Sequence, residues 1–420
     1  MMDPVQQEAD RLYKAHFGKM VASLLYSFRD IDPETAEDLV HDSFSAALTT
    51  WRLQGIPLNP AGWVYKVCRN KTLNQLKKEK RTEALDEHTL AGSAEMRFSE
   101  SVLDDQSLKL LFACAHPDLS PKVQVVITLK YVANLKVEAI AGSLAMTIDG
   151  VDKLLLRARQ KIKDEKILLE EPATPALSAR LSSVHKVIYL IFNEGYKSSW
   201  GTEILREELC EEALLMNKAL LDSALGNKET LALHALMLFS SARFRSRFGA
   251  SGELIDLENQ DRTLWNKELI ALGSHYLHQS RSDTVSKYHL EASIACLHCM
   301  AESFHTTHWK TIAALYAQLL HGTPNPFIAL NHAIALYHAG EKSRAFEILH
   351  ELQRHPFLGQ YYLLNTALGK FHHLEGNDAA AKEYLLKAQR QTNFEKEKEF
   401  IQKMIDELGD VAGCQLPVTS

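Results

Sequence analysis

The sequence of 420 residues has no apolar run long enough to cross a membrane, and residues 1–30 lack the apolar core of a secretory signal. It also lacks a disulfide framework, because its six cysteines are scattered in a way that is typical of reduced thiols. Strand-like alternation of apolar and polar residues is almost absent. We therefore expect a cytoplasmic, all-α protein that contacts no membrane.

The sequence has neither an excess of positive charge nor a recognisable catalytic motif. Its formal net charge of −6 argues against a protein that coats nucleic acid everywhere, so any DNA contact must come from local basic patches. Neither a glycine-rich phosphate loop nor a nucleophile motif is present. Glu194 and Asp261 could be paired carboxylates for hydrolysis, but capping of a helix end and a loop explains both more simply. We expect no enzyme activity and no cofactor.

A zinc site is the one metal centre that the sequence suggests. Cys296 and Cys299, with His305 and His308 nearby, are ligand types that zinc prefers. However, the segment that carries both cysteines is continuously helical in pattern, and they fall on its apolar face. We therefore expect core packing there and no bound metal.

The stretch from Pro121 to Lys163 predicts three short helices, with a tight break from Ala145 to Thr147 before the last one. The apolar stripe of that last helix consists of Ile148, Val151, Leu155, Ala158 and Ile162. Its other face is charged and displays Asp149, Asp152, Lys153, Arg157, Arg159, Lys161 and Lys163. Two short helices joined by a turn, of which the second has a basic outer face, are typical of a helix-turn-helix. Many three-helix bundles bind no nucleic acid, and acids near the start of the last helix would repel phosphates, although they can accept a hydrogen bond from cytosine.

Two of the helices expected before this stretch carry candidate binding residues. Asp32 and Pro33 mark the start of a helix with an acidic exposed side, which by itself is typical of a solvated face. From Gly62 to Arg81 a basic helix interleaves Trp63 and Tyr65 with many lysines and arginines. Aromatic rings and cations together can hold unstacked bases and their backbone. A surface helix whose aromatic residues face its own core would have the same composition.

The order of the segments AEDLVHDSF, WVYKVCRNKTLNQLKK, EAIAGSL and LLLRARQKI resembles extracytoplasmic-function sigma factors of the sigma-70 family. The resemblance covers residues 9–166 and implies two helical sigma domains. Region 2 would span residues 1–81, a linker residues 82–104, and the helix-turn-helix of region 4 residues 105–170. Core RNA polymerase and promoter DNA are the implied partners.

The resemblance also implies roles for particular residues. Core polymerase would be bound by Asp38, Leu39, Val40, His41 and Asp42. The melted downstream (−10) element would be bound by Trp63, Arg69, Asn70, Asn74, Lys77 and Lys78. The upstream (−35) element would be bound by Thr147, Asp149, Lys153, Arg157, Arg159 and Lys161. The chain departs from the family pattern at three places. The family often has Gln where this chain has His41, and it commonly has Asp where this chain has Asn74. Lys77-Lys78 replaces a frequent Arg pair, which would recognise bases better.

The chain continues far beyond these regions, after a boundary marked by the segment PATPALS at 172–178. The phrases YLIFNEGY and LENQDRTLW resemble the C-terminal extension of sigma factors with tetratricopeptide-like tails. We expect a helical extension at 178–290 and helical repeats at 291–410. An internal repeat with a period of 36 residues independently supports the prediction of helical repeats. Its first copy contains Leu330, Ala333, Gly340, Ala345 and Leu349, and the corresponding positions of the second copy are Thr366, Gly369, Gly376, Ala381 and Leu385.

Three functional hypotheses follow. In the first, the chain is a sigma factor whose extension modulates activity in cis, by contact with the 82–104 linker, with polymerase or with another protein partner. In the second, it is a helix-turn-helix regulator that carries a tetratricopeptide-like interaction domain and does not act through core polymerase. In the third, it is a helical-repeat enzyme or scaffold with an incidental N-terminal bundle. Binding to promoters with and without polymerase separates the first two.

Overall fold

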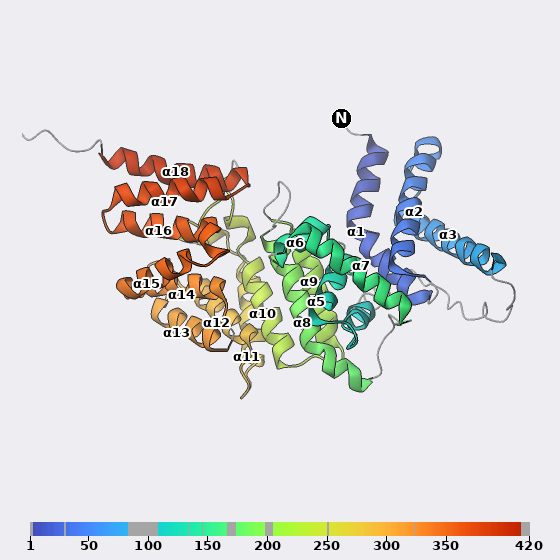
Figure 1. Ribbon diagram of the computed structural model, residues 1–420, viewed down its shortest axis with the longest axis horizontal. Helices are drawn as coiled ribbons and strands as arrows, with labels where there is room; N and C mark the ends of the chain where they lie inside the picture. The colour runs from blue at the N-terminus through green and yellow to red at the C-terminus, as the bar shows by residue number, and fades with distance from the viewer. Residues whose placement is uncertain are drawn as a thin grey trace, which may run out of the picture. The chain divides into compact units, whose positions relative to one another are not determined.

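The computed structural model describes residues 3–28, 31–82, 108–133, 135–144, 146–165, 174–197, 205–249, 252–322 and 324–412 (Figure 1). These residues form α-helices and short 3₁₀ turns, and their one β-like feature is an isolated antiparallel bridge between Phe248 and Leu254. The all-α class is confirmed. Within the described ranges, no helix combines the length and apolarity needed to span a bilayer. The chain divides into two compact units, Met1–Gly226 and Asn227–Ser420.

The first unit begins with a bundle of three helices, α1 (Pro4–Ser27), α2 (Pro33–Gln54) and α3 (Pro60–Thr82). The expected start of α2 is confirmed, because the Asp32 side chain accepts a hydrogen bond from the Thr35 backbone N–H at 3.0 Å. The helix ends at Gly55, whose φ of +81° suits a residue without a Cβ. Trp51 is buried between the helices and lies edge-on to Trp63 of α3, with 5.6 Å between ring centroids. This packing fixes α3 against α2.

The helix-turn-helix stretch follows, formed by helical residues 108–114 and by α5 (Pro121–Tyr131), α6 (Val137–Ser143) and α7 (Ile148–Asp164). The predicted start at Pro121 is confirmed, with Ser120 as the capping residue. The predicted stripe of α7 is buried from Val151 to Ile162. The prediction that Ile148 belongs to this stripe is wrong, since this residue is 46% exposed. It is the first residue of α7 and lies beyond the packed part of the stripe. Most of the 82–104 linker, and Ala145 of the break, lie outside the described residues.

Two more helices complete the first unit, α8 (Thr174–Tyr196) and α9 (Glu207–Asp222). Helix α8 begins before the expected boundary at 178 and packs on the helix-turn-helix stretch, where buried Arg180 donates from Nη1 to the Phe112 carbonyl at 2.9 Å. Glu194 accepts a hydrogen bond from Arg206 at 2.6 Å and is almost completely buried. Glu194 is therefore the partner of an arginine that joins α8 to α9, and not one of two paired carboxylates.

The second unit contains α10 (Lys228–Ser241), α11 (Lys267–Gln279), α12 (Lys287–Met300) and α13 (Trp309–Gly322). It continues with α14 (Pro326–His338), α15 (Lys342–Gln353), α16 (Tyr362–Leu374), α17 (Asp378–Gln391) and α18 (Glu395–Ala412). Short 3₁₀ turns lie at Phe244–Ser246, Arg262–Leu264 and Leu358–Gln360. Asp261 caps the second of these by accepting from the Thr263 N–H at 2.8 Å, which confirms its predicted capping role.

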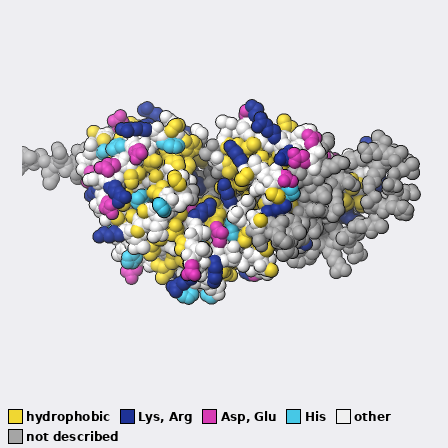
Figure 2. Space-filling view, turned by 60° about the horizontal axis from the view of Figure 1, so that its bottom comes forward, with side chains coloured by type: hydrophobic (Ala, Val, Ile, Leu, Met, Phe, Trp, Pro, Cys, Tyr) yellow, Lys and Arg dark blue, Asp and Glu magenta, His cyan; other side chains and the backbone are white. Residues whose placement is uncertain are grey.

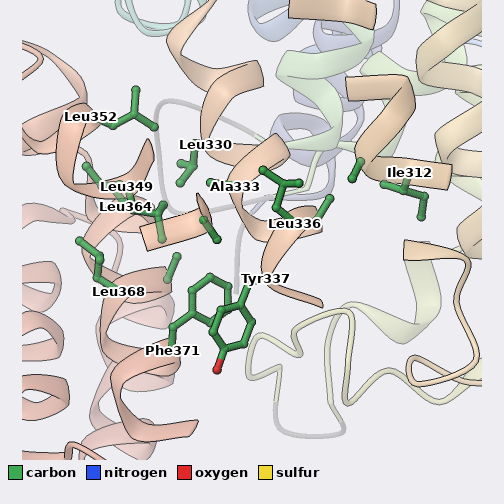
Figure 3. Packing of buried hydrophobic residues seen from close by; sticks show 14 of the residues in the cluster. Ile312, Leu330, Ala333, Leu336, Tyr337, Leu349, Leu352, Leu364, Leu368 and Phe371 are labelled. Atoms are coloured by element: carbon green, nitrogen blue, oxygen red, sulfur yellow. The ribbon is translucent and has the colours of Figure 1, made fainter. Parts of the chain in front are cut away.

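The 36-residue repeat is visible as two helical hairpins, α14 with α15 and α16 with α17. Each hairpin turns at a glycine with positive φ, Gly340 at +94° and Gly376 at +76°. A Cβ on Gly369 would lie 2.7 Å from Cγ of Leu385, so the second hairpin requires a glycine at its crossing point. The two hairpins meet through Tyr337 and Phe371, whose rings stack with 3.7 Å between centroids (Figure 3). The repeat in the sequence therefore predicts this part of the fold.

Candidate functional site

The acidic face of α2 presents three of the five residues expected to bind core polymerase. Asp38, His41 and Asp42 are exposed, whereas Leu39 and Val40 are buried in the bundle. The His41 ring lies against α1, 4.6 Å from the Phe17 ring between centroids. Oδ2 of Asp42 lies 3.6 Å from Nζ of Lys71 on α3. A partner would thus meet two carboxylates and one imidazole, while the two apolar residues hold the helix in place from within.

Helix α3 presents most of the residues expected at the downstream element. Asn70 and Asn74 are exposed one turn apart, and Lys77 and Lys78 follow on the same side. Arg69 is half-buried, and so is Trp63, whose ring lies against Trp51. Tyr65, in contrast, is 4% exposed and belongs to the core. The alternative interpretation of an inward-facing aromatic is therefore correct for Tyr65 and partly correct for Trp63.

The last turn of α2 and the loop that follows it add a feature that the sequence reasoning missed. Leu53, Ile56 and Leu58 are 83%, 41% and 108% exposed, although large apolar side chains usually avoid water. They lie beside the start of the basic helix and give it an apolar border. The available signal was the presence of two apolar residues, Ile56 and Leu58, in a Gly/Pro loop directly after Leu53 at the end of a helix.

The outer face of α7 presents the central residues expected at the upstream element. Thr147 caps the helix, with Oγ1 accepting from the Gly150 N–H at 3.1 Å. Lys153 and Asp149 pair at 2.7 Å one turn apart, so the acid offsets part of the lysine's charge. Arg157 is exposed. Leu156 on the same face is 64% exposed and was missed; the signal was a run of three leucines of which the buried stripe uses only one.

Arg159 and Lys161, in contrast, contact groups of their own chain. Arg159 donates from Nε to the Tyr131 hydroxyl at 2.9 Å, and its Nη1 lies 4.0 Å from the Glu34 carboxylate of α2. Lys161 donates from Nζ to the Asp118 carbonyl at 2.6 Å. These contacts leave Lys153 and Arg157 as the outward-facing cations among the residues expected at this element.

A second ion pair connects the helix-turn-helix stretch to α2. Nζ of Lys130 on α5 lies 3.3 Å from Oε1 of Glu37, and both side chains are mostly buried. Glu37 lies one helical turn before the exposed His41 on α2. Glu34 and Glu37 thus face cations of α7 and α5, while Asp38 and Asp42 face outward.

Of the cysteine pair considered for zinc, Cys299 belongs to the core of the second unit and Cys296 is half-buried. Cys299 of α12 is buried, and its Sγ donates to the Phe239 carbonyl at 3.7 Å. Burial raises the pKa of the Cys299 thiol to about 11, which disfavours the thiolate that zinc would need. Within the described ranges, no cluster of three or more His, Cys, Asp or Glu side chains has a geometry that could hold a metal ion.

The distribution of charge agrees with a net negative protein that has local cationic sites. On the face shown in Figure 2, Lys and Arg side chains lie scattered among acidic and apolar ones and do not merge into one basic surface. On this face, contact with a polyanion would therefore depend on individual cationic groups and not on one broad basic surface.

Comparison with known proteins identifies domains of the sigma-70 family in this chain. Residues 13–82 match the family described as sigma-70 region 2, and residues 109–162 match sigma-70 region 4. Residues 180–281, from α8 to α11, match a family of unknown function, DUF6596. The uncharacterized protein R00370 of Rhizobium meliloti (strain 1021) is 33% identical over 324 residues, which cover 75% of this chain and 76% of that protein. No solved structure matches the chain significantly. The chain therefore contains two sigma-70 domains, region 2 in the bundle of α1 to α3 and region 4 in the helix-turn-helix stretch.

Proposed function

We propose that this chain is a cytoplasmic sigma factor of the extracytoplasmic-function type, which binds core RNA polymerase and directs initiation at specific promoters. The observation that carries the proposal is the presence of regions 2 and 4 in one chain, in that order. Sigma-70 family proteins are initiation factors, so the expected contribution is binding energy and not covalent chemistry. The family resemblance of the 9–166 segment supports the finer assignment.

Core polymerase binds, in this proposal, to the acidic face of α2. Asp38 and Asp42 are one turn apart and exposed, and His41 lies between them. Charged side chains on such a face suit a basic surface of the polymerase, because complementary charge speeds encounter and fixes register. Leu39 and Val40 act indirectly, since their burial holds the helix that carries these groups.

Promoter DNA binds to α3 and α7. At the downstream element, the half-buried Trp63 and the exposed Asn70 and Asn74 offer one ring and two amides to unpaired bases, and Lys77 and Lys78 neutralise phosphates. At the upstream element, Lys153 and Arg157 point outward from α7 and can donate to guanine in a major groove. Leu156 between them suits a thymine methyl group.

The C-terminal extension, a tetratricopeptide-like tail, modulates this activity in cis. A tether of this kind raises the local concentration of its surfaces to roughly millimolar, so even weak contacts would be occupied. We expect that removal of residues 227–420 will reduce transcription while the first unit stays folded. A cut after Glu171 is less informative, because it also removes Arg180, which binds the Phe112 carbonyl. Equal transcription by residues 1–226 and the full chain, at matched helix content by circular dichroism, would show that the tail is a passenger.

The proposal is tested by promoter binding in the presence and absence of core polymerase. A labelled promoter selected from a library should be shifted by the chain only when core polymerase is present. If the chain alone shifts the duplex with the same affinity and sequence preference, the chain is a helix-turn-helix regulator and the sigma-factor proposal fails.

A further inference from the structure

The second unit contains a groove of about 510 Å³ that no part of the proposed function uses. One wall is the segment 253–259, the base is the end of α16 together with Leu385 of α17, and the other wall is α18. Its volume falls in the range of sites that hold ligands or anchoring side chains. The geometry is therefore that of a binding groove built from three separate parts of the unit.

The lining of the groove is largely apolar. Leu254 and Ile255 line one wall, Phe400 and Met404 line the other, and Leu374 lies at the end of α16. Leu374 is 54% exposed although it is a large apolar residue. Exposed apolar area inside a concave site favours a ligand that brings apolar side chains of its own.

Carboxylates line both walls of the groove. They are Glu253, Asp256, Glu258, Glu399 and Glu407, and the ammonium groups that line it are those of Lys370 and Lys403. Lys370 is already paired, at 2.9 Å with Asp256 and at 2.6 Å with Glu258. Glu399, Lys403 and Glu407 follow one another at single-turn spacing along the exposed side of α18. The groove therefore retains an excess of negative charge.

We propose that this groove binds a cationic amphipathic segment of a protein partner. The segment places its apolar side chains on the apolar lining, and its lysines or arginines reach the carboxylates on α18 and on the 253–259 wall. The acidic walls repel nucleic acid, and a small polyamine has the charge but no apolar side chains for the lining. An uncharged apolar ligand would desolvate the carboxylates without pairing them. Charge complementarity together with the apolar lining thus selects a basic amphipathic peptide.

This inference does not rest on the sigma-factor role, because peptide binding is measured without polymerase or DNA. The probe is a fluorescently labelled peptide of about 16 residues, with leucines on one helical face and lysines on the other, titrated into the full chain. A matched peptide has glutamate in place of every lysine. We expect micromolar binding of the lysine peptide, weakened by salt, and at least about tenfold weaker binding of the glutamate peptide.

Paired variants of α18 locate the binding site. Glu399→Lys with Glu407→Lys should weaken the lysine peptide at least about tenfold, because two like charges would then face it. The control is Glu395→Lys with Asp406→Lys, which makes the same charge change at two exposed positions of α18 outside the groove. This control should change affinity less than about twofold after salt screening.

Three results would overturn the proposal. Equal weakening by the control variant would show non-specific attraction to an acidic protein. Full competition by spermidine would make the groove a site for small cations. A dimer in sedimentation velocity that the Glu399→Lys/Glu407→Lys variant dissociates would assign the groove to a second copy of the chain.

Discussion

We expect His298 and His338 to make the stability of the second unit dependent on pH. Both rings lie against Trp309, with centroids 5.3 Å and 4.7 Å away. Burial lowers the pKa of His298 to about 3, and the nearby guanidinium groups of Arg243 and Arg262 act in the same direction. The folded protein therefore keeps the His298 ring neutral in mildly acidic solution.

His338 behaves in the same way but is less completely enclosed. Burial lowers its pKa to about 4; the positive charges of Lys370 and His305 add to this effect, and Glu258 opposes it. In the unfolded chain both histidines have a pKa of about 6.5. As the pH falls below that value, the unfolded state takes up protons that the folded state does not, so the free energy of unfolding decreases.

The magnitude follows from the difference between the two pKa values. Each pH unit below about 6.5 costs about 1.4 kcal/mol for a histidine that stays neutral when folded. At about pH 5 the loss is therefore about 2 kcal/mol for His298, and somewhat less for the partly exposed His338. Together the two rings should lower the free energy of unfolding by roughly 3 kcal/mol between about pH 7 and pH 5.

Urea unfolding of the full chain, followed by tryptophan fluorescence, measures this loss. The chain divides into two compact units, so the fluorescence change that Trp309→Phe removes identifies the transition that reports on the second unit. His298→Gln should remove about 2 kcal/mol of the pH dependence of that transition. The control His278→Gln, at an exposed position of α11, should leave it unchanged. If wild type and His298→Gln lose the same stability on acidification, burial of a neutral His298 is not the cause.

Three further predictions concern the surfaces of the first unit. Asp38→Arg with Asp42→Arg should weaken binding to core polymerase by several kcal/mol, which is about the scale of interfacial charge pairs. The fold should stay intact, because the Asp42–Lys71 contact is exposed. Wild-type affinity in a pull-down titration, with Asp10→Arg on α1 as the control, would refute this assignment. Trp63→Ala or Asn70→Ala should reduce promoter melting in permanganate footprints without loss of binding to core polymerase, since these side chains are proposed to act on unpaired bases. A normal footprint would show that Trp63 and Asn70 do not contact the downstream element. Lys153→Ala or Arg157→Ala should each cost about 1–3 kcal/mol of the free energy with which the holoenzyme binds the promoter, if the side chain reaches a base edge. The same loss for promoters with and without an upstream element would show that the side chain contacts only phosphate.

Local sequence signals predicted the all-α class and the starts of particular helices. Asp32-Pro33 and Ser120-Pro121 start helices in the structure as they do in the sequence pattern. The recurrence of glycine 36 positions apart predicted the turns at Gly340 and Gly376, because helical hairpins need a residue that tolerates positive φ there. Periodicity also predicted which side of α7 is buried, apart from its first residue.

Contacts between distant segments could not be predicted in this way. The pairs Glu194–Arg206, Glu37–Lys130 and Arg159–Glu34 depend on how helices pack, and no local spacing encodes them. For the same reason the groove of the second unit, which takes residues from the 253–259 segment and from α16, α17 and α18, leaves no motif in the sequence. Helical periodicity also could not predict the exposure of Ile56 and Leu58, because these residues lie in a loop and belong to no helical stripe.

The most direct test of the central proposal is run-off transcription with purified core RNA polymerase, the full chain and a library of promoter fragments. If the chain is a sigma factor, transcripts should start at a discrete subset of promoters and should require both components. Addition of Asp38→Arg/Asp42→Arg in place of the wild-type chain should abolish those transcripts. Output no greater than that of core polymerase alone, from a chain that is folded by circular dichroism, would contradict the proposal.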